Sequence, residues 1–179
     1  MKKFVYLFLI VLSVLSCRNT DKEMSRRDKK ITSQAVAAAE DYAKVQLKDA
    51  TRSVTDQGII VLSDSTCRIL IDPSKIVAGD FEGDTLTDAI IPLYLFREQN
   101  QNMTIHLFLI NNEGKLMTVR ALEDDMNVLS VMKRVIYIEL PVKSSDDKNP
   151  GPMGKKEVKE FIFEGDSLRR YSSSTDTIR

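Results

Sequence analysis

Residues 87–122 read TDAIIPLYLF, REQNQN, MTIHLFLI, NNEG and KLMTVRAL in succession. Three apolar segments rich in β-branched and aromatic residues alternate here with short polar stretches. Such segments are typical of strands joined by tight turns. Asn111–Gly114, which separates the second segment from the third, is a favourable turn sequence and predicts a hairpin over 103–122. Pro92 lies inside the first segment, where it predicts an edge strand or a bulge.

The same strand pattern continues on both sides of this stretch. Polar or glycine-containing turns separate segments of alternating or continuous apolar residues, as expected for an antiparallel sheet. The predicted strands are residues 59–62, 68–71, 75–78, 134–142, 158–163 and 167–171. The polar residues 143–157, which contain Pro and Gly, predict a surface loop.

The chain before the strands has the period of a helix instead. Thr32 or Ser33 can cap its start, and Thr51–Ser53 predicts its end. A largely small apolar stripe recurs at helical spacing, formed by Val36, Ala39, Ala43, Leu47 and Ala50. This pattern indicates an amphipathic helix that packs closely against its neighbour.

One helix followed by hairpins predicts a single α+β domain over residues 32–171, with a polar tail at 172–179. The simplest arrangement lays the N-terminal helix across one face of a curved antiparallel β-sheet. In the order of its elements, this arrangement resembles cystatin-like or NTF2-like folds. That analogy carries no function with it.

The first residues have the organisation of a signal peptide. The basic start at residues 1–3 precedes a 12-residue apolar run at 4–15, which is short of the ~20 residues needed to span a bilayer. The run ends at Val14, Ser16 and Cys17. These residues resemble the lipobox of bacterial lipoproteins, with an aliphatic residue, a small residue and the invariant cysteine at the required spacing.

The resemblance implies an exported protein of the bacterial cell envelope, at the outer membrane or cell surface of a Gram-negative cell. Residues 1–16 would be removed, and Cys17 would become the N-terminus and carry acyl chains such as palmitate. Two or more chains are needed for stable anchoring to the membrane. The polar residues 17–31 then predict a flexible leash between lipid and domain.

Charge and cysteine content limit the expected partners. The chain has 26 basic and 26 acidic residues, and removal of Lys2 and Lys3 with the signal peptide leaves a net charge of −2. This balance does not favour nucleic-acid binding, so the expected partners are the membrane and an envelope protein or glycan. If Cys17 is acylated, Cys67 has no intramolecular partner, and its strand position predicts a small core residue.

The segment with the clearest chemical pattern is the acidic stretch at residues 79–88, GDFEGDTLTD. It resembles calcium loops of the EF-hand, dockerin and FG-GAP type, because its carboxylates stand at positions 1, 3, 5 and 9: Asp80, Glu82, Asp84 and Asp88. The carbonyl of Leu86 would supply a further ligand. The sequence departs from the pattern at Thr85, where the turn requires Gly, and at Ile91, where an EF-hand has Glu. Three interpretations remain open: a calcium site, an ordinary Asp- and Gly-rich turn, and a degenerate calcium loop that keeps the turn shape and has lost the metal.

No catalytic set is evident in the sequence. The only histidine, His106, lies in an alternating strand and is expected to be structural or half-exposed. The acidic groups at 123–125 and 146–147 are expected to be solvated. The sequence therefore predicts a non-enzymatic binding module without a cofactor. The alternatives are a calcium-stabilised module and a hydrolase that uses carboxylates of residues 80–88 together with His106.

Overall fold

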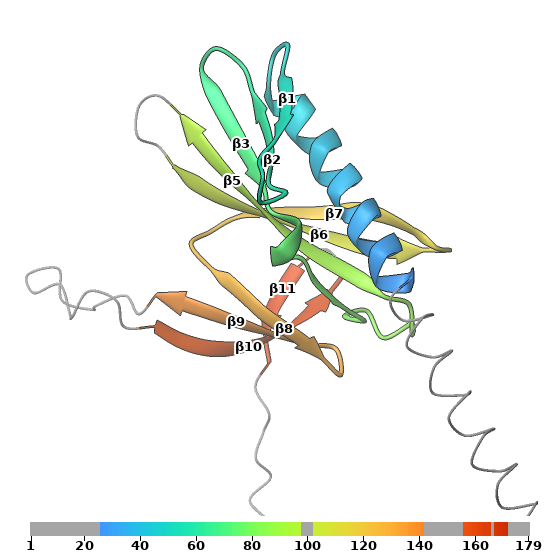
Figure 1. The fold of residues 1–179 in the computed structure, drawn as a ribbon. Coiled ribbons are helices and arrows are strands. Elements are labelled where there is room, and N and C mark those ends of the chain that lie inside the picture. The colour runs from blue at the N-terminus through green and yellow to red at the C-terminus, as the bar shows by residue number, and fades with distance from the viewer. Residues whose placement is uncertain (1–25, 98–101, 142–155, 166, 172–179) are drawn as a thin grey trace, which may run out of the picture.

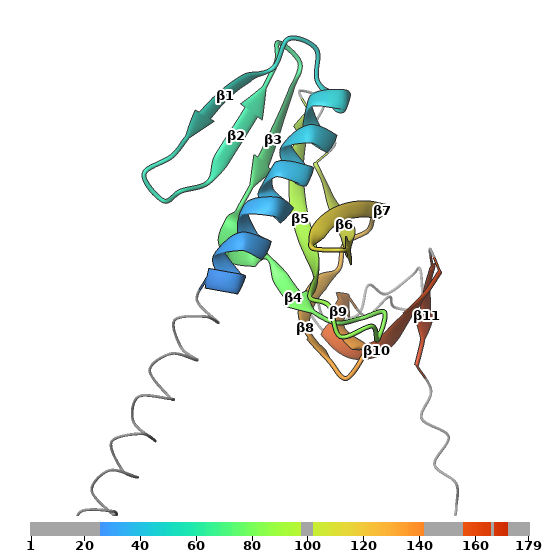
Figure 2. The same ribbon diagram turned by 90° about the vertical axis from the view of Figure 1, so that its right-hand side faces the viewer.

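A computed structural model of the chain describes residues 26–97, 102–141, 156–165 and 167–171. It confirms the α+β class, with one helix and antiparallel strands. The strands form two sheets rather than the single sheet expected (Figure 1). The helix covers one sheet, and the second sheet lies at the lower end of the molecule in both views (Figure 2).

The helix occupies residues 26–46 of the described chain and buries a stripe with a period of four. The stripe consists of Ile31, Ala35, Ala39, Ala43 and Leu47. The expected start at Thr32 or Ser33 is wrong, since residues 26–31 of the expected leash are already helical. Ile31 extends the apolar stripe by one turn, and the charged residues before it are good helix formers apart from Asp28.

The seven-stranded sheet has the order β1-β2-β3-β5-β6-β7, with β4 also paired to β5. Its strands are β1 (Thr51–Val54), β2 (Ile60–Ser63), β3 (Cys67–Ile71), β4 (Val77–Gly79), β5 (Asp88–Arg97), β6 (Met103–Asn112) and β7 (Lys115–Glu123). The expected β2–β3 and β6–β7 hairpins are both confirmed. The latter turns at Glu113 and Gly114, whose φ angles of 52° and 88° are those of a type I′ turn.

Pro92 lies in a central strand, and the expectation of an edge strand or bulge is wrong. It pairs with His106 of β6, while on the other side β4 pairs with residues 88–90 and β3 with residues 93–97. The 3₁₀ turn η1 (Pro73–Lys75) lies between β3 and β4. Pro92 therefore falls where the partner strand is interrupted, so a residue without a backbone N–H is accommodated.

The four-stranded sheet has the order β11-β10-β9-β8. Its strands are β8 (Asn127–Met132), β9 (Val135–Pro141), β10 (Lys156–Glu164) and β11 (Ser167–Arg170). The expected β9 strand and β10–β11 hairpin are confirmed. The sequence did not predict β1, which is exposed throughout, or β8, where a bulge near Leu129 interrupts the alternation of apolar residues.

The two faces of the seven-stranded sheet bury two separate cores. Odd-numbered residues of β5 and β6, such as Leu93 and Leu107, pack under the helix. Even-numbered residues, such as Ile90 and Phe108, face the four-stranded sheet. Burial on both faces explains why both strands read as nearly continuous apolar runs.

Edge strands β4 and β8 bring the two sheets together at one point. A Cβ on Gly79 of β4 would lie 2.6 Å from the Cβ of Val131 of β8. Such an approach requires the absence of a side chain at position 79. Next to this contact, residues of η1, β4 and β8 line the candidate site.

Candidate functional site

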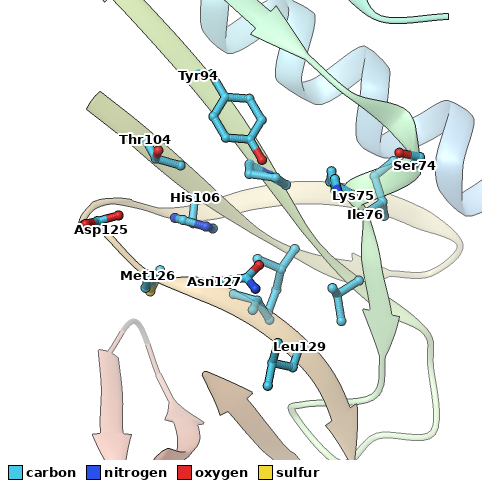
Figure 3. A pocket seen from close by; sticks show the side chains of 14 residues that line it. Ser74, Lys75, Ile76, Tyr94, Thr104, His106, Asp125, Met126, Asn127 and Leu129 are labelled. Carbon is cyan, nitrogen blue, oxygen red and sulfur yellow. The ribbon is translucent and has the colours of Figure 1, made fainter. Parts of the chain in front are cut away.

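A cavity of about 470 Å³ lies between the two sheets, beside the point where β4 and β8 approach each other. Its walls come from η1, β4, β5, β6 and β8 (Figure 3). The apolar part includes Ile90, Pro92, Met126 and Val128. A volume between about 300 and 1,000 Å³, with apolar walls and a few polar groups, is typical of a ligand site.

His106 is the buried ionisable group of this cavity. Its residue is only 3% exposed, and its Nδ1 atom has no hydrogen-bond partner in the structure. Burial lowers the pKa of its imidazole to about 4, while the nearby Asp124 carboxylate acts in the opposite direction. The ring is therefore neutral at pH 7, and an unpaired buried ring nitrogen costs on the order of 1–3 kcal/mol.

Polar side chains of three strands surround the cavity. The Tyr94 hydroxyl of β5 and the Asn127 side chain of β8 line it beside His106 of β6 (Figure 3). The Asn127 amide also donates a hydrogen bond to the Glu139 carboxylate. Burial, and secondarily the charge of Asp72, raises the pKa of the Tyr94 hydroxyl, which therefore remains protonated and able to donate. The cavity thus offers hydrogen-bond donors and acceptors against apolar walls.

The acidic loop at residues 80–88 is arranged differently, because its carboxylates bind its own backbone. Asp88 is fully buried at the start of β5. Its Oδ2 accepts hydrogen bonds from the N–H groups of Phe81 (3.0 Å) and Glu82 (3.4 Å). Its Oδ1 accepts one from the N–H of Asn111 at 2.9 Å. Burial raises the pKa of the Asp88 carboxyl, and these three donors partly offset that effect.

The exposed side of the loop has the same kind of bonding. Asp80 accepts hydrogen bonds from the N–H groups of Gly83 and Thr85, and Asp84 accepts one from that of Leu86. Burial, followed by the charges of Asp88, Asp84 and Asp80, raises the pKa of the Glu82 carboxyl. Thr85 has a φ of 72°, in the left-handed region where calcium loops place glycine. The loop therefore keeps the turn at the expense of strain in Thr85.

An aromatic cluster anchors this loop between the sheets. Phe81 is fully buried and packs edge-on against Phe108 and Phe163, with ring centroids 6.2 Å and 5.3 Å away. The latter two rings stack at 5.5 Å. The loop thus closes one part of the gap between the sheets, while the His106 cavity occupies another.

The structure does not bring the four predicted calcium ligands together as a site. Among the described residues, no group of three or more His, Cys, Asp and Glu side chains is placed to hold a metal ion. None of Asp80, Glu82, Asp84 and Asp88 lines the His106 cavity. This separation removes the arrangement that the carboxylate hydrolase would require.

Of the two alternatives expected for His106, the structure excludes the half-exposed one: the residue is buried, and its Nδ1 has no hydrogen-bond partner. The signal was present in the run MTIHLFLI, whose apolar residues on both faces predict a doubly buried strand. A histidine in such a strand is buried whichever way it points. Cys67 is half-buried and packs at the margin of the core under the helix, rather than fully inside it.

No protein-family model, curated protein or solved structure matches this chain. Within the described ranges there is no helix of the length and apolar character needed to cross a membrane. The signal peptide, Cys17, most of the expected leash, residues 143–155 of the expected loop and the tail at 172–179 lie outside the described residues. Lys156 and Glu157, the end of that expected loop, belong instead to β10. The function is therefore inferred from the chain's own residues and geometry.

Proposed function

We propose that the protein is a lipid-anchored, non-enzymatic ligand-binding module of the bacterial cell envelope. Residues 1–16 direct export, acyl chains on Cys17 hold the protein at the membrane, and the cavity around His106 binds the ligand. The anchor is supported by the lipobox residues Val14, Ser16 and Cys17. The ligand site is supported by one observation above all, the buried Nδ1 of His106 without a partner on a cavity wall.

This observation favours binding over a purely structural role because buried polar atoms are nearly always paired in folded proteins. An unpaired polar atom in a dense core destabilises the fold, whereas one in a side chain that lines a cavity can gain a partner when a ligand binds and the ring reorients. The remaining wall groups, Tyr94 and Asn127, can orient that molecule. No carboxylate of the acidic loop lines the cavity, so the proposal is for binding without catalysis.

We also propose that the helix and its sheet are arranged as in cystatin-like or NTF2-like folds. A helix lying across an antiparallel sheet is the feature shared with cystatin-like and NTF2-like arrangements, and both are scaffolds on which binding sites can be built. In this chain the four-stranded sheet adds the second wall of the cavity.

Metabolic labelling tests the anchor. Cells that express the full-length chain are grown with an alkyne-tagged palmitate, and the label on the purified protein is measured. We expect label on the wild type and on Cys67→Ala, but none on Cys17→Ala, which should accumulate as the uncleaved precursor. Cys67 is the matched control because it is the only other cysteine. An unlabelled wild type would overturn the anchor.

The ligand site has a convenient reporter, because the chain contains a single histidine. A protein with isotope-labelled histidine gives one imidazole signal by NMR, and a molecule bound in the cavity must shift it. A panel of short peptides, sugars, amines and carboxylic acids at millimolar concentration tests the site. A shift with at least one class supports the proposed binding function, and no shift with any class would overturn it.

A further inference from the structure

We propose that the outer face of the four-stranded sheet lies on the lipid surface that carries the anchor, with the basic start of the helix on the same surface. This inference rests on the proposed lipid anchor and is independent of the His106 cavity. It adds an interaction surface and the class of its partner, an anionic lipid bilayer. It is carried by an exposed apolar face, by the charge of the helix start and by the short connection to Cys17.

The outer face is the side of the four-stranded sheet that points away from the seven-stranded sheet. Ile136 of β9 and Phe163 of β10 belong to the core between the sheets. Their neighbours along each strand therefore point outward, because successive side chains of a strand alternate between its faces. The register places apolar residues of three adjacent strands in one row on this outer face, namely Met132, Val135 and Ile162.

Further apolar and aromatic residues extend this row. Tyr137 and Val158 lie on the same face by the same alternation, and Tyr171 lies beside β10, where its N–H donates to the carbonyl of Glu160. Met132, Val158 and Tyr171 are exposed. An exposed apolar face of this kind marks a surface that contacts another protein or a membrane.

The connection to Cys17 favours the membrane as the occupant. Nine residues, 17–25, precede the described helix, and a chain of that length spans at most about 30 Å. The helix begins at the end of the molecule that holds the four-stranded sheet and ends at the opposite end (Figures 1 and 2). A lipid on Cys17 therefore holds this end near the bilayer, where the high effective concentration lets a weakly binding face stay bound.

The charge of the helix start suits an anionic lipid surface. Residues 26–30 contain four basic residues and one acidic residue, a net charge of +3, and all five are exposed. Basic clusters next to a membrane anchor bind anionic headgroups. On the outer face, Glu139 is paired with Lys156 and Glu164 with Arg169. The half-buried Glu160 opposes the attraction, but the basic helix start outweighs its single charge.

A tryptophan reporter tests the contact, because the chain contains no tryptophan of its own. Val158→Trp places the reporter on the outer face, and Val54→Trp places it on β1 at the opposite end of the molecule (Figure 1). The two valines are 56% and 52% exposed, which makes the second variant a matched control.

The lipidated full-length variants are reconstituted into vesicles of phosphatidylglycerol and phosphatidylethanolamine, with or without bromine on the acyl chains. We expect brominated lipid to reduce the emission of Val158→Trp roughly twofold, because an apolar face on a bilayer enters the boundary between headgroups and acyl chains. The emission of Val54→Trp should not change.

Substitutions in the Val158→Trp background separate the two contacts. Met132→Glu and Tyr171→Glu place charges at exposed positions of the face and should abolish the quenching. Replacement of Lys29 and Lys30 by Gln should weaken it, whereas replacement of Lys44 and Lys48 by Gln, at the other end of the helix, should not. Circular dichroism of each variant checks that the fold is retained.

Flotation of the protein with the vesicles distinguishes the contact from the anchor. A chain that floats, but whose two tryptophans respond equally to bromine, would overturn the contact and leave the anchor standing. A shift of the Val158→Trp emission to shorter wavelength without quenching would show that protein, such as a second copy, covers the face, and would also overturn the lipid contact. A chain that does not float would overturn both the anchor and the contact.

Discussion

Asp88 and His106 are both buried polar groups on adjacent central strands of the same sheet, yet their surroundings are opposite. Asp88 is surrounded by three backbone donors, whereas the Nδ1 of His106 has no partner. The first arrangement stabilises a loop and the second destabilises the unliganded fold. The comparison shows that pairing, rather than burial alone, separates a structural group from a candidate binding group.

The largest expected change in stability is that of a substitution at Asp88, the paired group. Asp88→Ala leaves the N–H groups of Phe81, Glu82 and Asn111 without their acceptor. We expect a loss of about 3 kcal/mol or more in the free energy of unfolding, measured with urea. Asp84→Ala, at an exposed site with one N–H bond, is the control and should lose about 0.5 kcal/mol. Equal losses in the two variants would contradict the claim that the buried, triply bonded Asp88 stabilises the fold more than the exposed Asp84.

The variant His106→Leu tests whether the unpaired Nδ1 of His106 destabilises the fold. Removal of the unpaired nitrogen should raise the free energy of unfolding by about 1–2 kcal/mol at pH 7.5. A core histidine that only supports the fold would instead lose stability on substitution. Urea unfolding of the two proteins separates these outcomes.

The same variant should remove a pH dependence. The pKa of His106 is about 4 in the folded protein and about 6.5 in the unfolded chain, so the unfolded chain binds more protons between these values. The wild type therefore has this stability in full above pH 6.5 and loses it as the pH falls toward 4, by up to about 3 kcal/mol. The advantage of His106→Leu over the wild type should widen across that window, and a constant difference would refute the buried neutral state.

A smaller effect is expected at Thr85, where a β-branched residue has a φ of 72°. Thr85→Gly should raise the free energy of unfolding by about 0.5–1 kcal/mol, since relief of the left-handed strain exceeds the entropy cost of glycine. Thr87→Gly, in the same loop without a positive φ, should lower it by a similar amount. Thermal or urea unfolding of the pair measures the difference, and a loss in both variants would contradict the strain.

The smallest expected effect is that of calcium. Because Asp80, Asp84 and Asp88 already accept backbone hydrogen bonds, we expect no change in the melting temperature between EDTA and 10 mM Ca²⁺. A site with a Kd of about 1 mM would add roughly 1.4 kcal/mol under these conditions. A rise in the wild type would restore the calcium interpretation. A rise confined to Thr85→Gly would show a calcium loop that lacks only its glycine.

Periodicity was sufficient for most of the architecture. The amphipathic helix and the three hairpins followed from apolar spacing and from turn residues such as Glu113 and Gly114. The missed helix start and the missed β8 have local causes, but the position of Pro92 depends on strands that are remote in sequence. Pro92 is tolerated because β3 and β4 leave a break opposite it, and β8 was hidden by a bulge.

The candidate site was less predictable for the same reason. The acidic loop could be recognised in the sequence because its carboxylates are closely spaced along the chain. In the structure, Asp80 and Asp88 accept hydrogen bonds from backbone N–H groups. The cavity is formed by segments that are separate in the chain, from η1 to β8, and a single histidine has no spacing to recognise. Only the packing of one sheet on the other places His106, Tyr94 and Asn127 around one space.

The most direct test of the central claim is an NMR titration of the single histidine in the full-length chain. A buried, neutral imidazole whose Nδ1 lacks a partner should titrate with a pKa of about 4, and a molecule of the ligand panel that binds in the cavity should shift its signal at pH 7. An imidazole that titrates near 6.5, with a signal that no member of the ligand panel shifts, would contradict both the buried state of His106 and its role in binding.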